Sequence, residues 1–446
     1  MKRKKWMVMI MALCMLGLSL FGGCQKVYED NRDDRYIVMV FTNTHYEEVE
    51  SYAAEMRVLL GENDPSTGRM YAAGYIGPML LTQSIEQMQR EVNMAFDMAE
   101  KFNIPVYFQL DDINNYTTLF GSGAEVKYWE DPSMCEWIAF PEEGEEYGGQ
   151  NAYGELPRFW YNWGSWRVAN PVPNFASPAF RELIVNNLKE GFLKPLNERY
   201  NQLKKDGKAY LFAGCAVGWE THIPDYTSDN RLLNLSVNNL PRDYSTGVPM
   251  HEWELAQYGY GALHSLGYDQ EKLDAEAAEQ GITSKQHMKN ILFQVIHDYT
   301  EMLAKTVYEA GVPRNKIFTH TVSARTTLGN DCTFYPPIWT AVNDYSTPGY
   351  TMSPVTCKYD MNTMKKELYE ADPNFNEFAC AEGYAAGLDT VEKCDAYFQE
   401  MFSNGARIVT AFGYPDVGVP VFEFRRDPDF PYIISTNNWL RGDLNV

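Results

Sequence analysis

The sequence predicts a (β/α)8 barrel, and three observations support this expectation. Short apolar runs with strand character alternate with longer amphipathic stretches along most of the chain. Eight such runs can be distinguished, and this alternation is typical of a parallel sheet covered by helices. The segment that holds them, residues 36–446, is long enough for one barrel of this type. A doubly wound open sheet is the alternative architecture.

The first half of the chain supplies four of the predicted strands. They cover residues 35–43, 70–77, 104–110 and 209–218. Between them, residues 84–102 form a strongly amphipathic helix. Ser177 is a suitable N-cap for a further helix, which reaches residue 203 and is interrupted at Pro195.

The second half supplies the other four strands. They cover 316–322, either 337–342 or 350–355, then 375–384 and 406–414. A long helix precedes them and is capped by Gly311, and another covers about 390–403. Two segments, 113–176 and 221–283, are too long for ordinary connections, and we expect them to shape a binding site.

The N-terminus has the layout of an export signal. Residues 2–5 are basic, residues 6–21 are apolar, and two glycines precede Cys24. This pattern resembles a bacterial lipoprotein signal, which implies cleavage after residue 23 and a lipid on Cys24. We therefore expect residues 24–35 to be a flexible tether and the protein to be exported and lipid-anchored to a bacterial membrane, without spanning it.

Charge and cysteine usage exclude several classes of function. The formal net charge is −22, and it becomes four units more negative when the basic residues of the signal are removed. Such an acidic chain is a poor candidate for binding nucleic acid or an anionic membrane surface. No CxxC, HExxH or His-x-His pattern occurs, so the sequence predicts neither a metal nor another cofactor.

Two glutamates stand at the ends of predicted buried strands, where a charged side chain is unfavourable unless it has a functional role. Glu220 ends "GCAVGWE" and Glu382 lies in "EFACAEGY". In a barrel, the carboxyl ends of the strands meet at one face, where active sites lie. Two carboxylates on one pocket suit glycosidic bond cleavage, because one donates a proton and the other attacks carbon or activates water.

With these residues at the fourth and seventh strands, the chain resembles the clan A glycoside hydrolases, a group of retaining (β/α)8 enzymes. The resemblance covers about 36–446 and implies that Glu220 is the general acid/base and Glu382 the nucleophile. Many members place an asparagine before the acid/base, whereas this chain has Trp219 there.

Other polar and aromatic residues are candidates for sugar contacts. Those predicted to follow strands are Asp111, Asp112, His222, His320, Tyr384 and Tyr414. Aromatic rings suit the apolar faces of pyranose rings, which makes Trp163, Trp219 and Trp339 candidates as well. For each there is a structural alternative, such as turn chemistry at the aspartates or a satellite core around Trp163.

The sequence thus predicts a retaining glycoside hydrolase acting on glycan or oligosaccharide through Glu220 and Glu382. A non-catalytic carbohydrate-binding lipoprotein on the same scaffold is the alternative, since fold alone does not fix function. A third hypothesis, a metal-dependent hydrolase, requires Asp111, Asp112, His222 and His320 to share one coordination sphere.

Overall fold

The computed structural model describes most of the chain beyond the N-terminal segment. The described residues are 30, 32–41, 46–112, 127–149, 156, 160–162, 166–168, 170–225, 227, 256–321, 336–352, 361–414 and 424–444. The predicted signal and Cys24 lie outside them, as does Trp163. Within the described part, no helix is both long and apolar enough to cross a bilayer.

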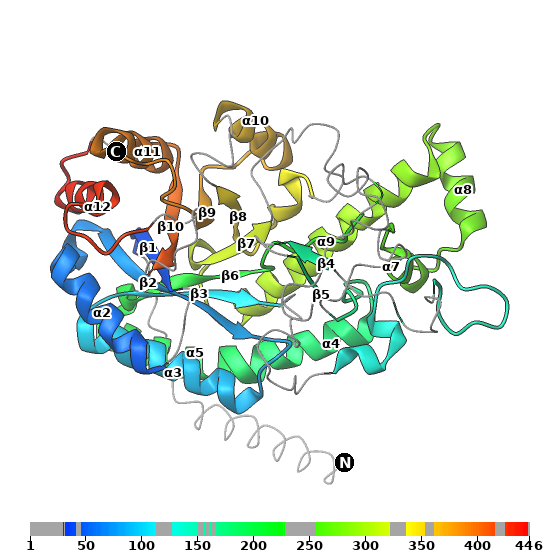
Figure 1. Cartoon of the computed structure of the whole chain (residues 1–446), viewed down its shortest axis with the longest axis horizontal. Helices are drawn as coiled ribbons and strands as arrows, with labels where there is room; N and C mark the ends of the chain where they lie inside the picture. Colours follow the sequence, from blue (N-terminus) through cyan, green and yellow to red (C-terminus); the bar gives the residue numbers. More distant parts are fainter. Residues whose placement is uncertain are drawn as a thin grey trace, which may run out of the picture.

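Eight parallel strands close into a barrel, which confirms the predicted fold (Figure 1). In chain order the strands are β1 (Arg35–Phe41), β2 (Arg69–Met79), β3 (Val106–Asp111), β6 (Phe212–Val217), β7 (Ile317–Thr321), β8 (Thr347–Met352), β9 (Phe378–Gly383) and β10 (Ala406–Tyr414). Each strand pairs with its neighbour in this order, and β1 pairs with β10 to close the ring. The open-sheet alternative is therefore wrong.

The sixth barrel strand is the one that the sequence left open. Residues 338–341 form a 3-10 turn and not a strand, whereas β8 begins at residue 347, close to the second predicted range. The turn packs on the outer layer, where Thr340 Oγ1 bonds Pro337 O at 2.7 Å and Ile338 O accepts from the Tyr350 hydroxyl at 3.0 Å.

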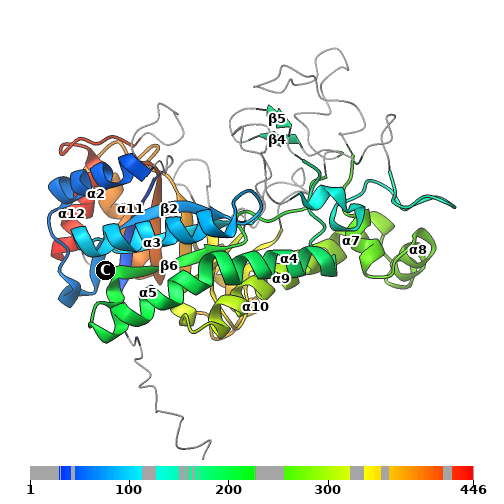
Figure 2. The ribbon, with the colours of Figure 1, turned by 90° about the horizontal axis from the view of Figure 1, so that it is seen from below.

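Helices surround the barrel on its outer side (Figures 1 and 2). They are α2 (Tyr46–Leu60), α3 (Ile85–Phe102), α4 (Pro178–Asn187), α5 (Lys194–Lys205), α9 (Ser284–Glu309), α10 (Met361–Ala371), α11 (Val391–Ser403) and α12 (Pro431–Arg441). Two further helices, α7 (Tyr260–Ser265) and α8 (Gln270–Glu279), lie beside α9 and away from the barrel strands. A short ribbon, β4 (Trp160–Asn162) with β5 (Trp166–Val168), is set apart from the barrel strands (Figure 2).

The helix that begins after Ser177 was predicted to be interrupted at Pro195, but its irregular stretch lies earlier in the chain. A π-helical stretch, residues 188–193, joins α4 to α5, and Pro195 sits in the first turn of α5, where a missing N–H is tolerated. At Gly191 a Cβ atom would lie 2.5 Å from the Met88 side chain, so α3 packs directly on this stretch. The irregular stretch therefore lies where two helices come unusually close.

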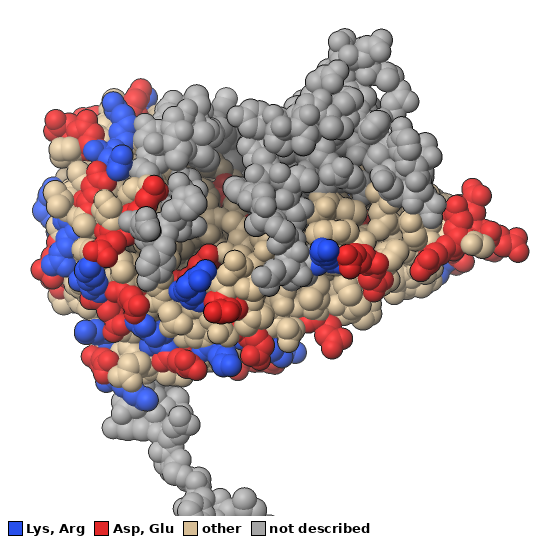
Figure 3. Space-filling model, turned by 60° about the horizontal axis from the view of Figure 1, so that its bottom comes forward, with Lys and Arg blue, Asp and Glu red and all other residues tan. Residues whose placement is uncertain are grey.

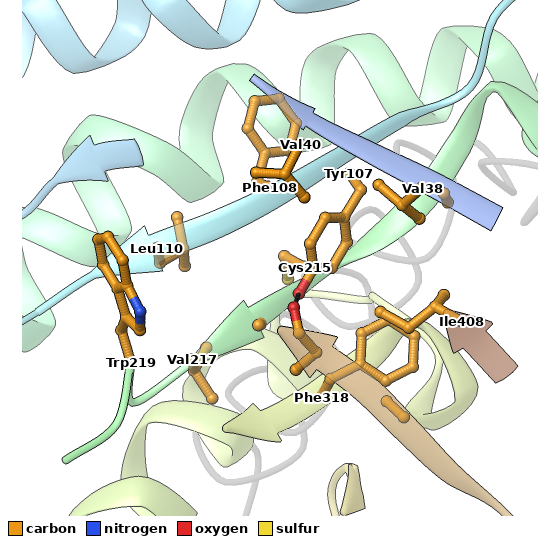
Figure 4. Packing of buried hydrophobic residues seen from close by; sticks show 14 of the residues in the cluster. Val38, Val40, Tyr107, Phe108, Leu110, Cys215, Val217, Trp219, Phe318 and Ile408 are labelled. Atoms are coloured by element: carbon orange, nitrogen blue, oxygen red, sulfur yellow. Dashed lines mark hydrogen bonds between the residues drawn. The ribbon is translucent and has the colours of Figure 1, made fainter. Parts of the chain in front are cut away.

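The barrel interior below its carboxyl end is filled by large side chains (Figure 4). Tyr107 and Phe318 are buried with ring centroids 6.2 Å apart, beside the buried Val38 and Ile408. The Tyr107 hydroxyl lies 3.3 Å from Ala381 O, so its one polar atom has a partner. This packed floor leaves the strand ends above it as the place for polar groups.

The opposite, amino-terminal end of the barrel holds the start of the described chain. Asp30 Oδ2 lies 3.0 Å from the buried Lys316 ammonium and accepts from the Tyr200 hydroxyl at 2.7 Å. Burial lowers the pKa of Lys316, while Asp30 acts in the opposite direction. Residues 30 and 32–34, predicted as part of the flexible tether 24–35, contact the barrel: Asp30 is the counter-charge of the buried Lys316, and Asp33 pairs with Arg407 of β10.

On the face shown in Figure 3, basic and acidic side chains are interspersed over the described surface. Arg199 of α5, for example, pairs with Asp97 and Glu100 of α3 at 2.6 Å each. These pairs bridge neighbouring helices of the outer layer. Being partly exposed, they contribute little to stability individually.

Gly214 is a position in β6 where only glycine fits. Its φ is +138°, and a Cβ atom there would lie 2.6 Å from Lys316 O, directly before the neighbouring strand β7. We expect Gly214→Ala to lower the free energy of unfolding by about 3 kcal/mol or more, through backbone strain and the clash. Denaturant unfolding followed by circular dichroism measures this loss.

The matched control is Gly207→Ala, at φ +71° with no atom within 4 Å of the added Cβ. It carries the backbone cost alone, about 1 kcal/mol. Equal losses in the two variants would contradict the close approach of β6 to β7.

Candidate active site

Glu220 is placed by a tight turn at the carboxyl end of β6. Gly218 has φ +75°, and Glu220 itself has φ +50°. Within the described part, Asn103 is the only other non-glycine residue with positive φ, and it caps a helix, where asparagine is common. A glutamate held in this region carries backbone strain, which is typical of functional positions.

The neighbouring strand and helix hold this turn in place. Asp112, directly after β3, accepts from the Trp219 backbone N–H at 3.0 Å through Oδ1. At Gly218 a Cβ atom would lie 2.7 Å from the Thr300 side chain of α9. Burial raises the pKa of Asp112 to about 6, although the hydrogen bonds of Tyr299 and Trp219 act in the opposite direction.

Glu382 is the penultimate residue of β9 and is only 7% exposed. The Trp219 indole N–H donates to its Oε2 at 3.0 Å, and the Tyr384 hydroxyl donates to its Oε1. Burial raises the pKa of Glu382, and these two donors act to lower it. Both carboxylate oxygens therefore face donors, which favour the ionised form and lessen the rise in pKa that burial causes, although the pKa stays above its ordinary value.

The two glutamates meet at the mouth of the barrel. One carboxylate oxygen of each, together with a ring nitrogen of His320, lie within 4.8 Å of one another. Glu220 is also only 7% exposed, and His320 is fully buried. Two buried carboxylates this close cannot both be ionised without a large cost in free energy. The arrangement therefore favours one protonated and one ionised carboxyl group.

Glu220 has its own partners beneath it. Its Oε1 lies 2.5 Å from Thr351 Oγ1 on β8, and Thr351 Oγ1 lies 2.8 Å from His320 Nε2 on β7. On the other side of the ring, His320 Nδ1 lies 2.9 Å from the Gln109 amide of β3. Burial lowers the pKa of His320 to about 3, so its imidazole is neutral near pH 7.

The remaining predicted residues are placed as follows. Asp111 is the buried last residue of β3, and Tyr384 bonds Glu382 as described. His222 bonds the backbone carbonyl of Glu220 at 2.7 Å through Nδ1, beside the turn. Tyr384 and His222 therefore contact the pair, and the roles of all three residues toward a ligand remain predictions.

Two predicted aromatic residues are packed elsewhere. Trp339 lies on the outer layer, where its ring is 5.7 Å from that of His297 on α9. Tyr414 is fully buried among Phe41, Tyr52 and Phe424, with ring centroids 5.4–6.1 Å away. The structure thus gives both residues packing partners outside the carboxylate pair.

The metal hypothesis needs Asp111, Asp112, His222 and His320 together. Among the described residues, these four do not form a cluster of ligand distance. Glu220, His320 and Glu382 are close enough for one ion, but both ring nitrogens of His320 have protein partners. A ligating imidazole must offer a nitrogen lone pair to the metal, so this site fits hydrogen bonding better than ligation.

Sequence reasoning missed Gln109 and Thr351. Gln109 is an amide inside the otherwise apolar start of β3, and it shares the inward face with Asp111 two residues later. That isolated polar residue was a usable signal. Thr351 gave none, because threonine is common in strands.

Comparison with known proteins gives fold-level likeness only. No protein-family model matches the sequence, and no curated protein does. The catalytic domain of β-amylase from Paenibacillus polymyxa is similar in structure at 7% identity, with a TM-score of 0.48 over 93% of this chain and 99% of that one. A GH5-4 broad-specificity endoglucanase from Clostridium cellulovorans is similar at 10% identity, with a TM-score of 0.39 over 93% and 95%. An exo-β-agarase shows 10% identity and a TM-score of 0.37 over 87% and 48%.

The indole of Trp219 should control the ionisation of Glu382. Trp219→Phe keeps the aromatic bulk but removes the donor to Oε2, so we expect the pKa of Glu382 to rise further. Carbon-13 NMR of glutamate-labelled protein follows this titration, with Glu382→Gln identifying the signal. Trp339→Phe is the control, because its ring lies on the outer layer. An unchanged Glu382 titration in Trp219→Phe would rule out the hydrogen bond as a determinant.

Proposed function

We propose that this protein is a retaining glycoside hydrolase acting on glycan or oligosaccharide. The observation that carries the proposal is the convergence of Glu220 and Glu382, both nearly buried, with carboxylate oxygens within 4.8 Å. They come from the fourth and seventh strands of the barrel and face the same mouth. Their hydrogen-bond environments differ, which suits two different roles.

Glu382 is the nucleophile in this mechanism. Its two donors, Trp219 and Tyr384, stabilise the ionised form against the effect of burial. Glu382 would attack the anomeric carbon, and the bond to the leaving oxygen would break as that oxygen takes a proton.

Glu220 is the general acid and then the general base. It would donate its proton to the leaving glycosidic oxygen, and afterwards take a proton from the water that releases the sugar from Glu382. Retaining enzymes hold the two carboxyl groups about 5–5.5 Å apart, whereas inverting enzymes leave about 6.5–9.5 Å for a water. Oxygens within 4.8 Å of each other support the retaining arrangement.

Hydrolysis of aryl glycosides by residues 25–446 tests the pair. We expect Glu382→Gln to lose about 10³-fold or more in rate on every substrate, because no covalent intermediate forms. Glu220→Gln should lose about 10²–10⁴-fold with poor leaving groups, and far less with dinitrophenolate, which needs no proton. The control is Glu136→Gln, a buried glutamate whose Oε2 accepts from the Ala262 backbone and which lies outside the pair.

Azide then separates the two roles. With Glu382→Gly it should give a glycosyl azide of inverted configuration, and with Glu220→Ala one of retained configuration. Full activity in both variants would exclude the pair. Sugar binding without turnover in the parent protein would favour the carbohydrate-binding lipoprotein instead.

We also propose export and lipid anchoring through Cys24, on the strength of the signal-like residues 1–23. When the full chain is expressed in a bacterium fed labelled palmitate, we expect label in the protein and a membrane-associated pool. Cys24→Ser should abolish both without loss of the folded barrel. Equal labelling of Cys24→Ser would rule out this attachment site.

A further inference from the structure

A chain of hydrogen bonds leads from Glu220 into the barrel interior. Its links are Glu220 Oε1 to Thr351 Oγ1 at 2.5 Å, Thr351 Oγ1 to His320 Nε2 at 2.8 Å, and His320 Nδ1 to the Gln109 amide at 2.9 Å. All four side chains are buried. Each link holds one proton, so the direction of one link determines the direction of the next.

The surroundings of Gln109 fix the innermost link. If its NH2 group faces His320, that group also faces the indole N–H of Trp219, and its oxygen faces the carbonyl oxygen of Ala381. The Tyr107 hydroxyl is then the one donor near this oxygen among the described residues, at a long 3.4 Å, and it also lies 3.3 Å from Ala381 O. If its oxygen faces His320, the amide nitrogen donates to Ala381 O at 3.0 Å, and the oxygen accepts from Trp219 Nε1 at 3.2 Å and His320 Nδ1 at 2.9 Å. The second orientation satisfies every group, and it requires a proton on His320 Nδ1.

The proton on Nδ1 decides the outer links. The imidazole of His320 is neutral, because burial lowers its pKa to about 3, so Nε2 carries no proton and accepts. The single hydroxyl proton of Thr351 then goes to Nε2. The link between Thr351 and Glu220 must take its proton from the carboxyl group of Glu220.

Ionised Glu220 needs the opposite arrangement. Thr351 would donate to the carboxylate, His320 would carry its proton on Nε2, and Gln109 would turn its NH2 group toward Nδ1. That turn sets the oxygens of Gln109 and Ala381 against each other and the NH2 group against the indole N–H of Trp219. The contacts of Gln109, at the inner end of this series of hydrogen bonds, therefore disfavour loss of the carboxyl proton of Glu220.

We propose that Gln109, His320 and Thr351 are positioning residues that hold Glu220 protonated and reverse their hydrogen bonds when its proton leaves. Their action on catalysis rests on the proposed function, whereas the hydrogen-bond directions do not. Among the described residues, the titratable groups placed nearest Glu220 from other elements are Glu382 on β9 and His320 on β7, while Asp112 after β3 bonds the neighbouring Trp219 backbone. Deprotonation next to ionised Glu382 would add a like charge, which acts in the same direction as the relay.

Nitrogen-15 NMR of histidine-labelled protein tests the relay directly. The chain has seven histidines, and His320→Gln identifies the signal. We expect His320 to be protonated on Nδ1 near pH 7 and to change to the Nε2 tautomer, without becoming charged, as Glu220 ionises at higher pH. A proton on Nε2 at every pH would overturn the proposal. So would an Nδ1 tautomer that persists while Glu220, followed by carbon-13, titrates.

The pH profile of kcat/KM gives a second test with a defined sign. Its alkaline limb reports the acid of the free enzyme. Without its acceptor, Glu220 should lose its proton more easily, so we expect Thr351→Val to move this limb to lower pH by about one unit. Thr351→Ser keeps the hydroxyl and should restore it. Gln109→Met, which removes the orienting amide, should move it in the same direction as Thr351→Val.

The matched control is Thr347→Val, the same change four residues earlier on β8, at a buried hydroxyl outside the relay. It should leave the alkaline limb in place. A move to higher pH in Thr351→Val would overturn the proposal, because it would mean that the hydroxyl donates to an ionised Glu220. A tautomer change in a protein that cleaves no glycoside would support the relay and reject the proposed function.

Discussion

The closeness of two buried acids is the constraint on which the rest of this site depends. Glu220 and Glu382 come within 4.8 Å while each is only 7% exposed. Water screens these charges poorly, so donors at one carboxylate and a proton on the other would each lower the cost of bringing them together. Trp219 and Tyr384 serve Glu382, and Thr351 with His320 serves Glu220. These four polar residues therefore reduce the cost of burying two carboxyl groups next to each other.

Trp219 connects the surroundings of Glu220 with those of Glu382. Its backbone N–H is held by Asp112, its indole bonds Glu382, and the next residue in the chain is Glu220. In the favoured orientation of Gln109, the same indole N–H also reaches the amide oxygen at 3.2 Å. The indole N–H thus connects the turn after β6 to Glu382 on β9.

The fold and the carboxylate pair were predictable from the sequence because both depend on local patterns. Apolar runs located seven strands within a few residues, and position after a strand located Glu220 and Glu382. The sixth strand was ambiguous because "TPGYTM" does not look like a buried strand. At Gly349 in it a Cβ atom would lie 2.8 Å from Thr319 O, a tertiary requirement that no local pattern reveals.

The relay was not predictable for a related reason. Gln109, His320 and Thr351 lie on three different strands, and only the register of the closed barrel brings them to one depth. Trp339 and Tyr414 were proposed from the sequence instead, and their contacts with a ligand stay predictions. Both follow the aromatic pattern expected of a sugar site, yet packing places them against His297 and against Phe41. Composition indicates which side chains suit a ligand, but not which of them face it.

The contact between Asp30 and Lys316 has a consequence for how the protein would sit on a cell. Lys316 precedes β7, at the end of the barrel opposite to Glu220 and Glu382. Cys24 lies six positions before Asp30, a reach of at most about 22 Å. A lipid on Cys24 would therefore keep the barrel's closed floor next to the bilayer and turn its open mouth outward, toward polymers too large to approach the membrane.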